Sequence, residues 1–535
     1  MANEILKICL EKGFLLDKEI LGLFSGLEEN FAKEIILNIK NTKPSERVIT
    51  KSFFIKNYEK LQEFIKKCEN NNNAKAFFIN VGCNSDVQQE KKEEDKDFVK
   101  ILSSPVVEPK KVCVLDFVKH FRARYSQIKS FLESKNLENL TSIRKIGPNR
   151  DNYTIIGAVL EKRITKNKNL LIEIEDPSGK AVVLVNQNKE DLFKQAKDLL
   201  QDDIVAFQVM GSSSMLFANN IIYPDSFLAE KKKHTSETLI AFTSDWHIGS
   251  SLSLEKNLLN FISWINCERG DEKQRELASK VKYLFLAGDN IDGVGVYPEQ
   301  NKLLKIMDIK EQYTRLAEII NLIRKDIKII MCPGQHDGVR VAEPQPIVDE
   351  CYAEELHKIK NLYLVPNPAL IEISGGFKVL IYHGASMHSL VGEIEDIRLN
   401  YKHNSPARIV RELLRRRHLS PTHGSVVYIP NEKEDPLVIS QVPDIVATGD
   451  LHRADISVYN NIMTIASSCW QSITPFEEKV GNNPDPCKVP ILNLKTREIK
   501  ILDFSGNEEE NDYANVQGEK VLDKLQIKQE ERKNA

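Results

Sequence analysis

The chain has 535 residues, of which 41 % are hydrophobic and 28 % charged, and this composition excludes a disordered or fibrous protein. A chain of this length is expected to form roughly two to four domains. The 74 basic and 77 acidic side chains nearly cancel, which excludes a uniformly basic protein. Any contact with nucleic acid must therefore come from local patches.

The cysteines and the apolar segments indicate where the protein works. Nine cysteines are scattered along the chain and none forms a C-x-x-C pair, which argues against a disulfide framework and a zinc ribbon. No apolar run reaches the roughly 18 to 20 residues of a membrane helix, and the N-terminus lacks the layout of a signal peptide. We therefore expect a soluble, cytoplasmic protein that does not contact a membrane.

The first part of the chain divides into a helical region, a linker and a connecting helix. Residues 1–69 carry apolar side chains at helical spacing, such as Ile35 and Ile36, and predict a helical N-terminal domain. Residues 70–111 are rich in asparagine, charge and proline, so we expect a disordered linker that cannot bury enough apolar surface to fold. The helical pattern returns in residues 112–149 and predicts a connecting helix.

The remainder is predicted to form two domains that contain β-sheet. Residues 150–230 show five short strands with a helix before the last pair, which is typical of an OB-type β-barrel. Such barrels bind oligonucleotides or serve as protein scaffolds, and the sequence favours neither use. In residues 235–505 buried strands alternate with helices, as in a layered α/β domain. Residues 506–535 are polar and predict a disordered tail, so the fold class is α+β and multidomain.

Five buried strands in the last domain each end in side chains that can bind a metal. The strand ends read Ser244-Asp-Trp-His247, Gly288-Asp-Asn-Ile-Asp-Gly293, Pro333-Gly-Gln-His-Asp337, His383-Gly384 and Gly449-Asp-Leu-His452. In open α/β sheets ligands collect beyond the carboxyl ends of the strands, so these segments can converge. A single one of them occurs by chance in many proteins, but five in succession indicate one shared site.

The side chains at the strand ends are mainly carboxylates and imidazoles. Together these groups suit Mn²⁺, Fe²⁺ or Zn²⁺, whereas a shell of oxygen atoms alone suits Mg²⁺ better. Two cations roughly 3.5 to 4 Å apart can hold a hydroxide for attack on phosphorus and stabilise the leaving oxygen. We therefore expect two divalent cations, with Mn²⁺ favoured and Mg²⁺, Fe²⁺ and Zn²⁺ as alternatives.

The order of these segments resembles the calcineurin-like metallophosphoesterase superfamily, whose pattern is D-x-H, G-D, G-N-H-[DE], H and G-H-x-H. The resemblance implies a four-layer α/β/β/α domain. It also implies a role for each matching side chain: Asp245, His247 and His452 as ligands of the first metal, Asp289 as the bridge, Gln335, His383 and Asp450 as ligands of the second metal, and His336 as the group that stabilises the phosphate charge. Asp289 and His336 are therefore the expected catalytic residues.

Longer strings resemble a narrower family, the small subunits of archaeal family D DNA polymerases. They are Pro333-Gly-Gln-His-Asp-Gly-Val-Arg-Val-Ala-Glu-Pro-Gln-Pro346, Arg416-Arg-His-Leu-Ser-Pro421 and Trp470-Gln-Ser-Ile-Thr-Pro-Phe476. The order of the predicted domains agrees with this family. The resemblance implies a metal-dependent 3′-to-5′ exonuclease that proofreads DNA 3′ ends, and a separate large subunit that carries polymerisation.

Two positions depart from the superfamily pattern on the side of the second metal. Gln335 stands where the pattern has asparagine, and Asp450 stands where it has histidine. Both side chains offer an oxygen ligand, and the other six motif residues remain, so we expect a retained nuclease. The alternative is a weakened or inactive scaffold subunit that links the polymerase chain to the replisome. A phosphoesterase acting on small molecules would leave the barrel and the N-terminal domain unexplained.

Basic and aromatic residues near these segments are further candidates for contact with DNA. Arg408, Arg411 and Arg415 share one helical face and could contact DNA phosphates, although a solvated face or a partner surface explains them equally well. Trp246 and Tyr297 could stack on an unpaired 3′ base, but packing is the more common role of such residues.

Overall fold

The computed structural model divides the chain into two compact units, Met1–Lys96 and Asp97–Ala535. It describes residues 7–50 with gaps at 11, 13–14, 25–28 and 42–47, then residues 53–54, 77, 97–105, 108 and 111–506. Most of the predicted linker, and the predicted tail beyond residue 506, lie outside the described residues. Within the described residues, no helix has the length and apolar character needed to cross a membrane.

The described residues of the first unit include two longer helices, as the spacing of its apolar residues predicts. They are α2 (Lys18–Phe24) and α3 (Glu29–Asn41), accompanied by two short parallel strands, β1 (Leu15–Leu16) and β2 (Val48–Ile49). Ala32, Ile35, Ile36 and Ile39 are buried, and because they recur every three or four residues they lie on one face of α3. This face packs into the core of the first unit.

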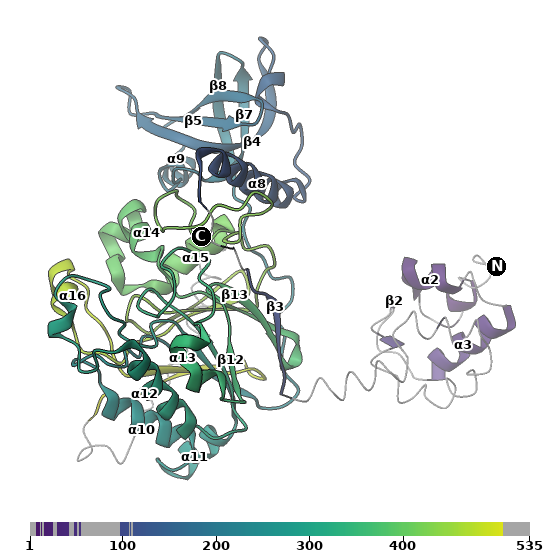
Figure 1. Cartoon of the computed structure of the whole chain (residues 1–535). Helices are drawn as coiled ribbons and strands as arrows, with labels where there is room; N and C mark the ends of the chain where they lie inside the picture. Colours follow the sequence, from purple (N-terminus) through teal and green to yellow (C-terminus); the bar gives the residue numbers. More distant parts are fainter. Residues whose placement is uncertain are drawn as a thin grey trace. The chain divides into compact units, whose positions relative to one another are not determined.

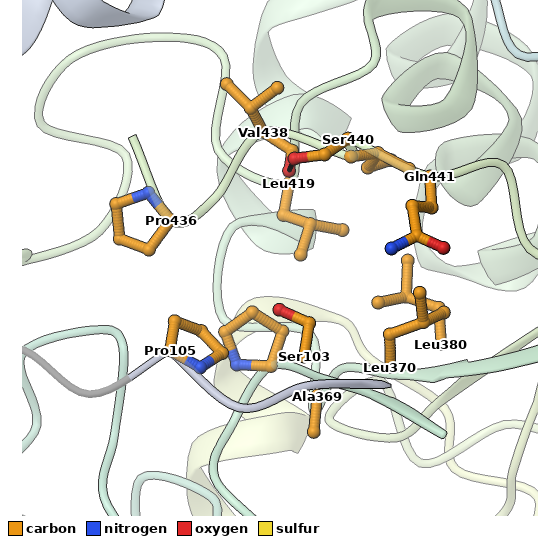
Figure 2. A pocket seen from close by; sticks show the side chains of 12 residues that line it. Ser103, Pro105, Ala369, Leu370, Leu380, Leu419, Pro436, Val438, Ser440 and Gln441 are labelled. Atoms are coloured by element: carbon orange, nitrogen blue, oxygen red, sulfur yellow. Dashed lines mark hydrogen bonds between the residues drawn. The ribbon is translucent and has the colours of Figure 1, made fainter. Parts of the chain in front are cut away.

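The second unit begins with a strand that the sequence did not predict. Strand β3 (Val99–Ser103) pairs antiparallel with β13 (Ala369–Ile373) at the edge of a sheet. The expectation of a disordered linker up to residue 111 is therefore wrong for these five residues. A short edge strand is stabilised by backbone pairing with a distant segment, and local composition does not reveal that pairing. Ser103 and Pro105 then help to line a small pocket of about 80 Å³ beside Leu370 (Figure 2).

A long helix and a closed five-stranded barrel follow. Helix α8 (Val114–Glu133) lies beside the barrel (Figure 1). The strand order of the barrel is β4-β5-β6-β8-β7. The barrel elements are β4 (Asp151–Ile164), β5 (Leu170–Asp176), β6 (Gly179–Val185), α9 (Glu190–Lys197), β7 (Ile204–Ser212) and β8 (Met215–Ile222). Val205, Phe207 and Val209 alternate with their neighbours and fill the interior. The predicted five-stranded barrel, with its helix before the last two strands, is confirmed.

The remaining strands form two six-stranded sheets. The first has the order β12-β11-β10-β9-β18-β19 and the second β16-β17-β15-β14-β13-β3. Their bounds are β9 (Leu239–Thr243), β10 (Val281–Ala287), β11 (Lys328–Cys332), β12 (Leu362–Leu364), β14 (Phe377–Ile381), β15 (Ile445–Thr448), β16 (Asp455–Tyr459), β17 (Ile462–Ala466), β18 (Lys488–Asn493) and β19 (Ile499–Asp503). One core joins the sheets, because Phe242 and Phe285 of the first pack in the same cluster as Ile371 and Val379 of the second.

Helices cover the outer faces of both sheets. Against the first sheet pack α10 (Glu255–Ile265), α11 (Glu272–Ser279), α12 (Ile309–Leu322) and α13 (Glu350–His357), and against the second pack α14 (Met387–Glu393) and α15 (Pro406–Arg416). The order of layers is thus helices, sheet, sheet, helices. Because both faces are covered, the central strands are continuous apolar runs.

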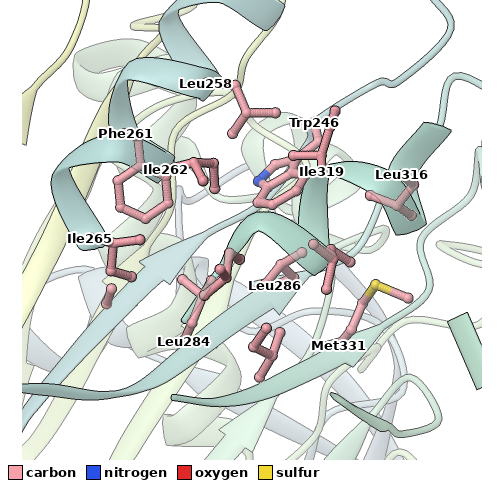
Figure 3. Close-up of a cluster of buried hydrophobic side chains, with 14 of the residues drawn as sticks. Trp246, Leu258, Phe261, Ile262, Ile265, Leu284, Leu286, Leu316, Ile319 and Met331 are labelled. Carbon is pink, nitrogen blue, oxygen red and sulfur yellow. The ribbon is translucent and has the colours of Figure 1, made fainter. Parts of the chain in front are cut away.

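Trp246 belongs to the core beneath the first layer of helices. It is 0 % exposed, lies among Leu258, Phe261 and Leu286 (Figure 3), and its indole N–H donates to Thr243 Oγ1 at 2.9 Å. The suggestion that Trp246 stacks on a DNA base is therefore wrong. The sequence placed it beside metal-binding side chains, but its ring turns to the opposite side of the segment.

Candidate metal centre

The five strand-end segments converge on one edge of the two sheets. Strands β9, β10 and β11 are parallel neighbours in the first sheet, and β14 and β15 are parallel neighbours in the second. Parallel neighbours end on the same edge, so the residues that follow them are brought together by the topology alone. The clustering of metal-capable side chains that the sequence pattern indicated is present.

The first cluster consists of Asp245, His247 and His452, whose donor atoms all lie within 4.8 Å of one another. His452 Nε2 is 3.3 Å from Asp245 Oδ1 and 3.2 Å from His247 Nε2. Asp245 and His247 are buried, and the side chain of His452 is 11 % exposed. These are the three side chains that the superfamily resemblance assigned to the first metal.

The second cluster consists of Asp245, Asp289 and His383, again within 4.8 Å. His383 Nε2 is 3.3 Å from Asp289 Oδ2 and 3.6 Å from Asp450 Oδ1. Asp245 is the carboxylate that both clusters share, whereas the superfamily resemblance assigned the bridge to Asp289. The bridging role of Asp289 stays a prediction, and Asp245 is a second carboxylate placed to take it.

His336 lies on the open side of the second cluster. Its Nε2 is 4.0 Å from Asp289 Oδ2, its backbone N–H donates to Asp289 Oδ1 at 2.9 Å, and its side chain is 20 % exposed. It also belongs to a third group of possible metal ligands, with His247 and Asp292. A partly exposed imidazole beside buried carboxylates is placed to contact a bound anion.

Several of the predicted ligand atoms are buried without a hydrogen bond. Asp245 Oδ1, Gln335 Oε1, His383 Nε2 and Asp450 Oδ2 have no hydrogen-bond partner among the described residues. Leaving a polar atom buried and unpaired costs roughly 1 to 3 kcal/mol, so native proteins rarely tolerate several together. Divalent cations would satisfy all four atoms, and carboxylate, imidazole and amide ligands suit Mn²⁺, Fe²⁺ or Zn²⁺. The residues therefore fit a pair of divalent cations.

The backbone of the ligand segments is also unusual. Five of the predicted ligands adopt positive φ angles: Asp245 (52°), His247 (44°), Asp289 (47°), Asp450 (68°) and His452 (55°). Residues other than glycine rarely adopt this left-handed region, and it costs of order 1 to 3 kcal/mol each when the fold imposes it. Gly334 allows the closest approach, because a Cβ atom there would lie 2.2 Å from Asp289 Oδ1.

The charges within the site reinforce one another. Burial disfavours a charged imidazole at His383, but the neighbouring carboxylate of Asp289 outweighs it and raises the pKa of His383 well above its usual value. Burial likewise opposes ionisation of Asp289, yet His383 and His336 hold the pKa of Asp289 well below its usual value. The cluster of carboxylates thus attracts positive charge strongly, and divalent cations can take the place of the protons.

The sequence comparisons agree with this geometry. A family model for the B subunits of DNA polymerases alpha and epsilon matches residues 240–456. The DNA polymerase II small subunit of Methanothermobacter thermautotrophicus is 37 % identical over 391 residues, which cover 73 % of this chain and 79 % of the relative. That of Pyrococcus furiosus is 34 % identical over 498 residues, covering 90 % and 80 %.

This chain belongs to the family of archaeal DNA polymerase II small subunits. The resemblance to the small subunits of family D polymerases is thereby confirmed. Among solved structures, an archaeal phosphodiesterase matches 50 % of the chain at 15 % identity with a TM-score of 0.25. Vps29 of Entamoeba histolytica complexed with zinc matches 50 % at 13 % identity with a TM-score of 0.24. Both scores are low.

In this member of the family, three imidazoles of the site each have a second group close to Nδ1. Asp292 Oδ1 lies 3.2 Å from His247 Nδ1, Glu477 Oε1 lies 2.8 Å from His452 Nδ1, and the Ala287 carbonyl oxygen lies 2.6 Å from His383 Nδ1. Each contact leaves Nε2 facing the site. Such partners orient metal-binding histidines and strengthen their binding.

Two of these partners, Asp292 and Glu477, were not predicted from the sequence. Asp292 follows Asp289 by three residues, so it could have been found in the same strand-end segment. Glu477 belongs to a Thr-x-x-Glu capping box with Thr474 at the start of α16 (Pro475–Val480), a pattern visible in sequence. The local pattern predicts the cap but not the contact with His452, 25 residues away.

The metal cluster opens into a cavity of about 770 Å³. Gln335, His336 and Asp450 line it beside the cluster, and the loop around Tyr297 and helix α16 also contribute to the lining. The Tyr297 ring lies 6.0 Å from that of His336. The cavity is large enough for a nucleotide, and stacking of a base on Tyr297 stays a prediction.

The three arginines of α15 face other parts of the protein. Their guanidinium groups lie over tyrosine rings: Arg408 over Tyr401 at 3.9 Å, Arg411 over Tyr459 at 5.3 Å and Arg415 over Tyr223 at 3.8 Å. None of the three is among the described residues that line the metal cavity. These contacts explain the arginines as packing groups, and their contact with DNA stays a prediction.

Proposed function

We propose that this chain is the 3′-to-5′ exonuclease subunit of a two-subunit DNA polymerase, in which a large subunit carries polymerisation. The observation that carries the proposal is the set of buried, unpaired ligand atoms at the base of the cavity. Family membership supplies the context of a polymerase. The two-sheet domain would then be a calcineurin-like phosphoesterase domain, and the five-stranded barrel an OB domain.

The residues of the site suit hydrolysis of a phosphodiester. Asp245, His247 and His452 would hold one divalent cation, and Asp289, Gln335, His383 and Asp450 the other. Bound cations would supply an activated hydroxide and neutralise the leaving oxygen. His336, partly exposed in the cavity, is placed to donate a hydrogen bond to a phosphate oxygen and stabilise the charge that develops on it.

The substrate would be a single-stranded or frayed 3′ end of DNA. The site lies within a cavity and the metal ligands are largely buried, so a base-paired terminus must separate before its last phosphodiester can reach them. This requirement would give preference to a mismatched primer terminus, since unpairing costs less there. Proofreading is the function that such a preference serves.

The direct test is release of mononucleotides from a mismatched primer terminus in Mn²⁺, measured on the full chain with and without the large subunit. We expect Asp289→Ala and His452→Ala each to lower the rate at least about 10³-fold. Asp326→Ala is the matched control, because this exposed aspartate precedes β11 and lies at the end of the strand opposite the ligands. Activity that survives in both site variants would refute the proposal, and an inactive wild-type complex would favour the scaffold alternative.

A further inference from the structure

The two halves of the metal centre differ in their supply of imidazoles. The first cluster offers two, His247 and His452, together with Asp245. Around the second position the assigned side chains are His383, the carboxylates of Asp289 and Asp450, and the amide of Gln335. An oxygen-rich set of this kind suits Mg²⁺ better than a transition metal.

A further histidine, His388, lies on the second side. It occupies the first turn of α14, the helix that follows directly after His383, and Met387 N–H donates to Gly384 O at 2.8 Å as the chain turns back. His388 Nε2 is 3.4 Å from Asp450 Oδ2. That oxygen is buried and has no hydrogen-bond partner among the described residues.

His388 shares the cavity of the metal centre. It lines the same cavity as Asp289, Gln335 and Asp450, and its side chain is 41 % exposed. Two ligand atoms bound at about 2.1 Å to one cation lie roughly 3.0 to 3.5 Å apart. The separation of His388 Nε2 from Asp450 Oδ2 matches this spacing for one pair of ligands, although His388 belongs to none of the groups of three donor atoms that lie within 4.8 Å of one another among the described residues.

We propose that His388 is a ligand of the second cation and supplies it with a second imidazole beside His383. The proposal rests on the proposed two-cation site but goes beyond the residues that the family resemblance assigns. In this chain Asp450 offers an oxygen where the superfamily pattern has a histidine. His388, from a different element, restores the nitrogen ligand and keeps the second position selective for Mn²⁺, Fe²⁺ or Zn²⁺ over Mg²⁺.

Metal binding to the metal-free full chain, measured by calorimetry and by electron paramagnetic resonance of Mn²⁺, tests the proposal. The wild type is expected to bind two Mn²⁺ and show the signal of a coupled pair. His388→Ala and His388→Gln should keep one Mn²⁺ site and bind Mn²⁺ at the other with an affinity at least about 10-fold lower. The signal of the coupled pair should be lost, and the ratio of Mn²⁺ to Mg²⁺ affinity at the second site should fall. His403→Ala is the matched control, because its ring lies 5.2 Å from that of His388 and it does not line the cavity described here.

Repeating the measurement in a variant of Asp450 distinguishes a metal ligand from a side chain that only pairs with Asp450. In Asp450→His, which returns an imidazole to position 450, removal of His388 should weaken the second site less than about 3-fold. Unchanged Mn²⁺ affinity in the folded His388 variants, or an equal loss in both backgrounds, would overturn the proposal. Because the readout is binding, a chain that binds two Mn²⁺ but cleaves no DNA would refute the proposed function and leave this inference standing.

Discussion

The second unit contains two buried clusters of aspartate and histidine that differ in their hydrogen bonding. In the metal centre, four ligand atoms have no hydrogen-bond partner among the described residues. In the other cluster, between α8 and the segment before β15, Asp435 Oδ2 lies 2.5 Å from Arg124 Nε and 2.8 Å from His418 Nε2. Asp435 Oδ1 accepts from Leu437 N–H at 2.9 Å, so both carboxylate oxygens are paired.

The comparison shows that burial of charge does not by itself mark a functional site. The cluster around Asp435 is as buried as the metal centre, but its atoms are paired with protein groups and it ties α8 to the last domain. Unpaired ligand atoms and left-handed backbone occur together at the metal centre. We infer that the cluster around Asp435 is complete as it stands, whereas the ligand atoms of the metal centre are placed to bind cations.

The largest expected effect follows from removing a charged partner from the cluster around Asp435. Arg124→Ala removes the positive partner of a buried carboxylate, and we expect a loss of roughly 3 to 5 kcal/mol in the free energy of unfolding with Mn²⁺ affinity unchanged. Arg122→Ala, on the exposed side of the same helix, should stay within about 0.5 kcal/mol. Denaturant unfolding measures both. Equal stability of the two variants would contradict the assignment of a structural role.

Binding of cations at the metal centre should stabilise the protein. Cations that bind only the folded state add about 2.7 kcal/mol per site at 100 times the dissociation constant, which corresponds to a rise in Tm of roughly 5 to 10 °C. The rise should shrink in Asp245→Asn, since Asp245 belongs to both groups of ligands. Thermal melts in Mn²⁺ and in chelator measure it, and identical melting curves would show that the unpaired atoms do not bind cations.

A smaller effect is expected from the groups that orient the ligands. Glu477→Gln removes the charge that faces His452 Nδ1 and keeps a side chain able to cap α16, so Mn²⁺ affinity should fall about 10- to 100-fold. Glu478→Gln, the exposed neighbour on the same helix, is the control. Calorimetric titration compares them, and matching affinities would mean that Glu477 serves only the helix cap.

The smallest effect is a pH dependence of stability that comes from His418 in the cluster around Asp435. Burial lowers the pKa of His418 from 6.5 to about 4, and Arg124 adds to this effect. The unfolded chain takes up the proton near pH 6.5 and the folded chain does not, so His418 lowers the stability as the pH falls through this window. Between pH 6.5 and pH 5 the loss should be on the order of 1 kcal/mol. Denaturant unfolding at both pH values should show this loss of unfolding free energy in the wild type and not in His418→Gln. An equal change in the free energy of unfolding in the two proteins would refute the role of His418.

Much of the metal centre could be predicted because its pattern is local. Asp245, Asp289 and His383 each follow a buried apolar strand, and strand ends meet wherever parallel strands are neighbours. The barrel could be predicted equally well, since the alternation of apolar and polar residues along β7 shows which side chains face inward. Strand β3 was missed because its stability comes from pairing with β13 and not from its own composition.

By itself the sequence determined the strands, the segments that follow them and the chemical type of the ligands, because periodicity and neighbouring residues record these features locally. Only the tertiary structure decided that Trp246 turns into the core, that Glu477 holds His452 and that His388 reaches Asp450. These contacts join residues that the chain order keeps apart. They depend on how the helices pack over the sheets, and no local sequence pattern records which distant residues come into contact.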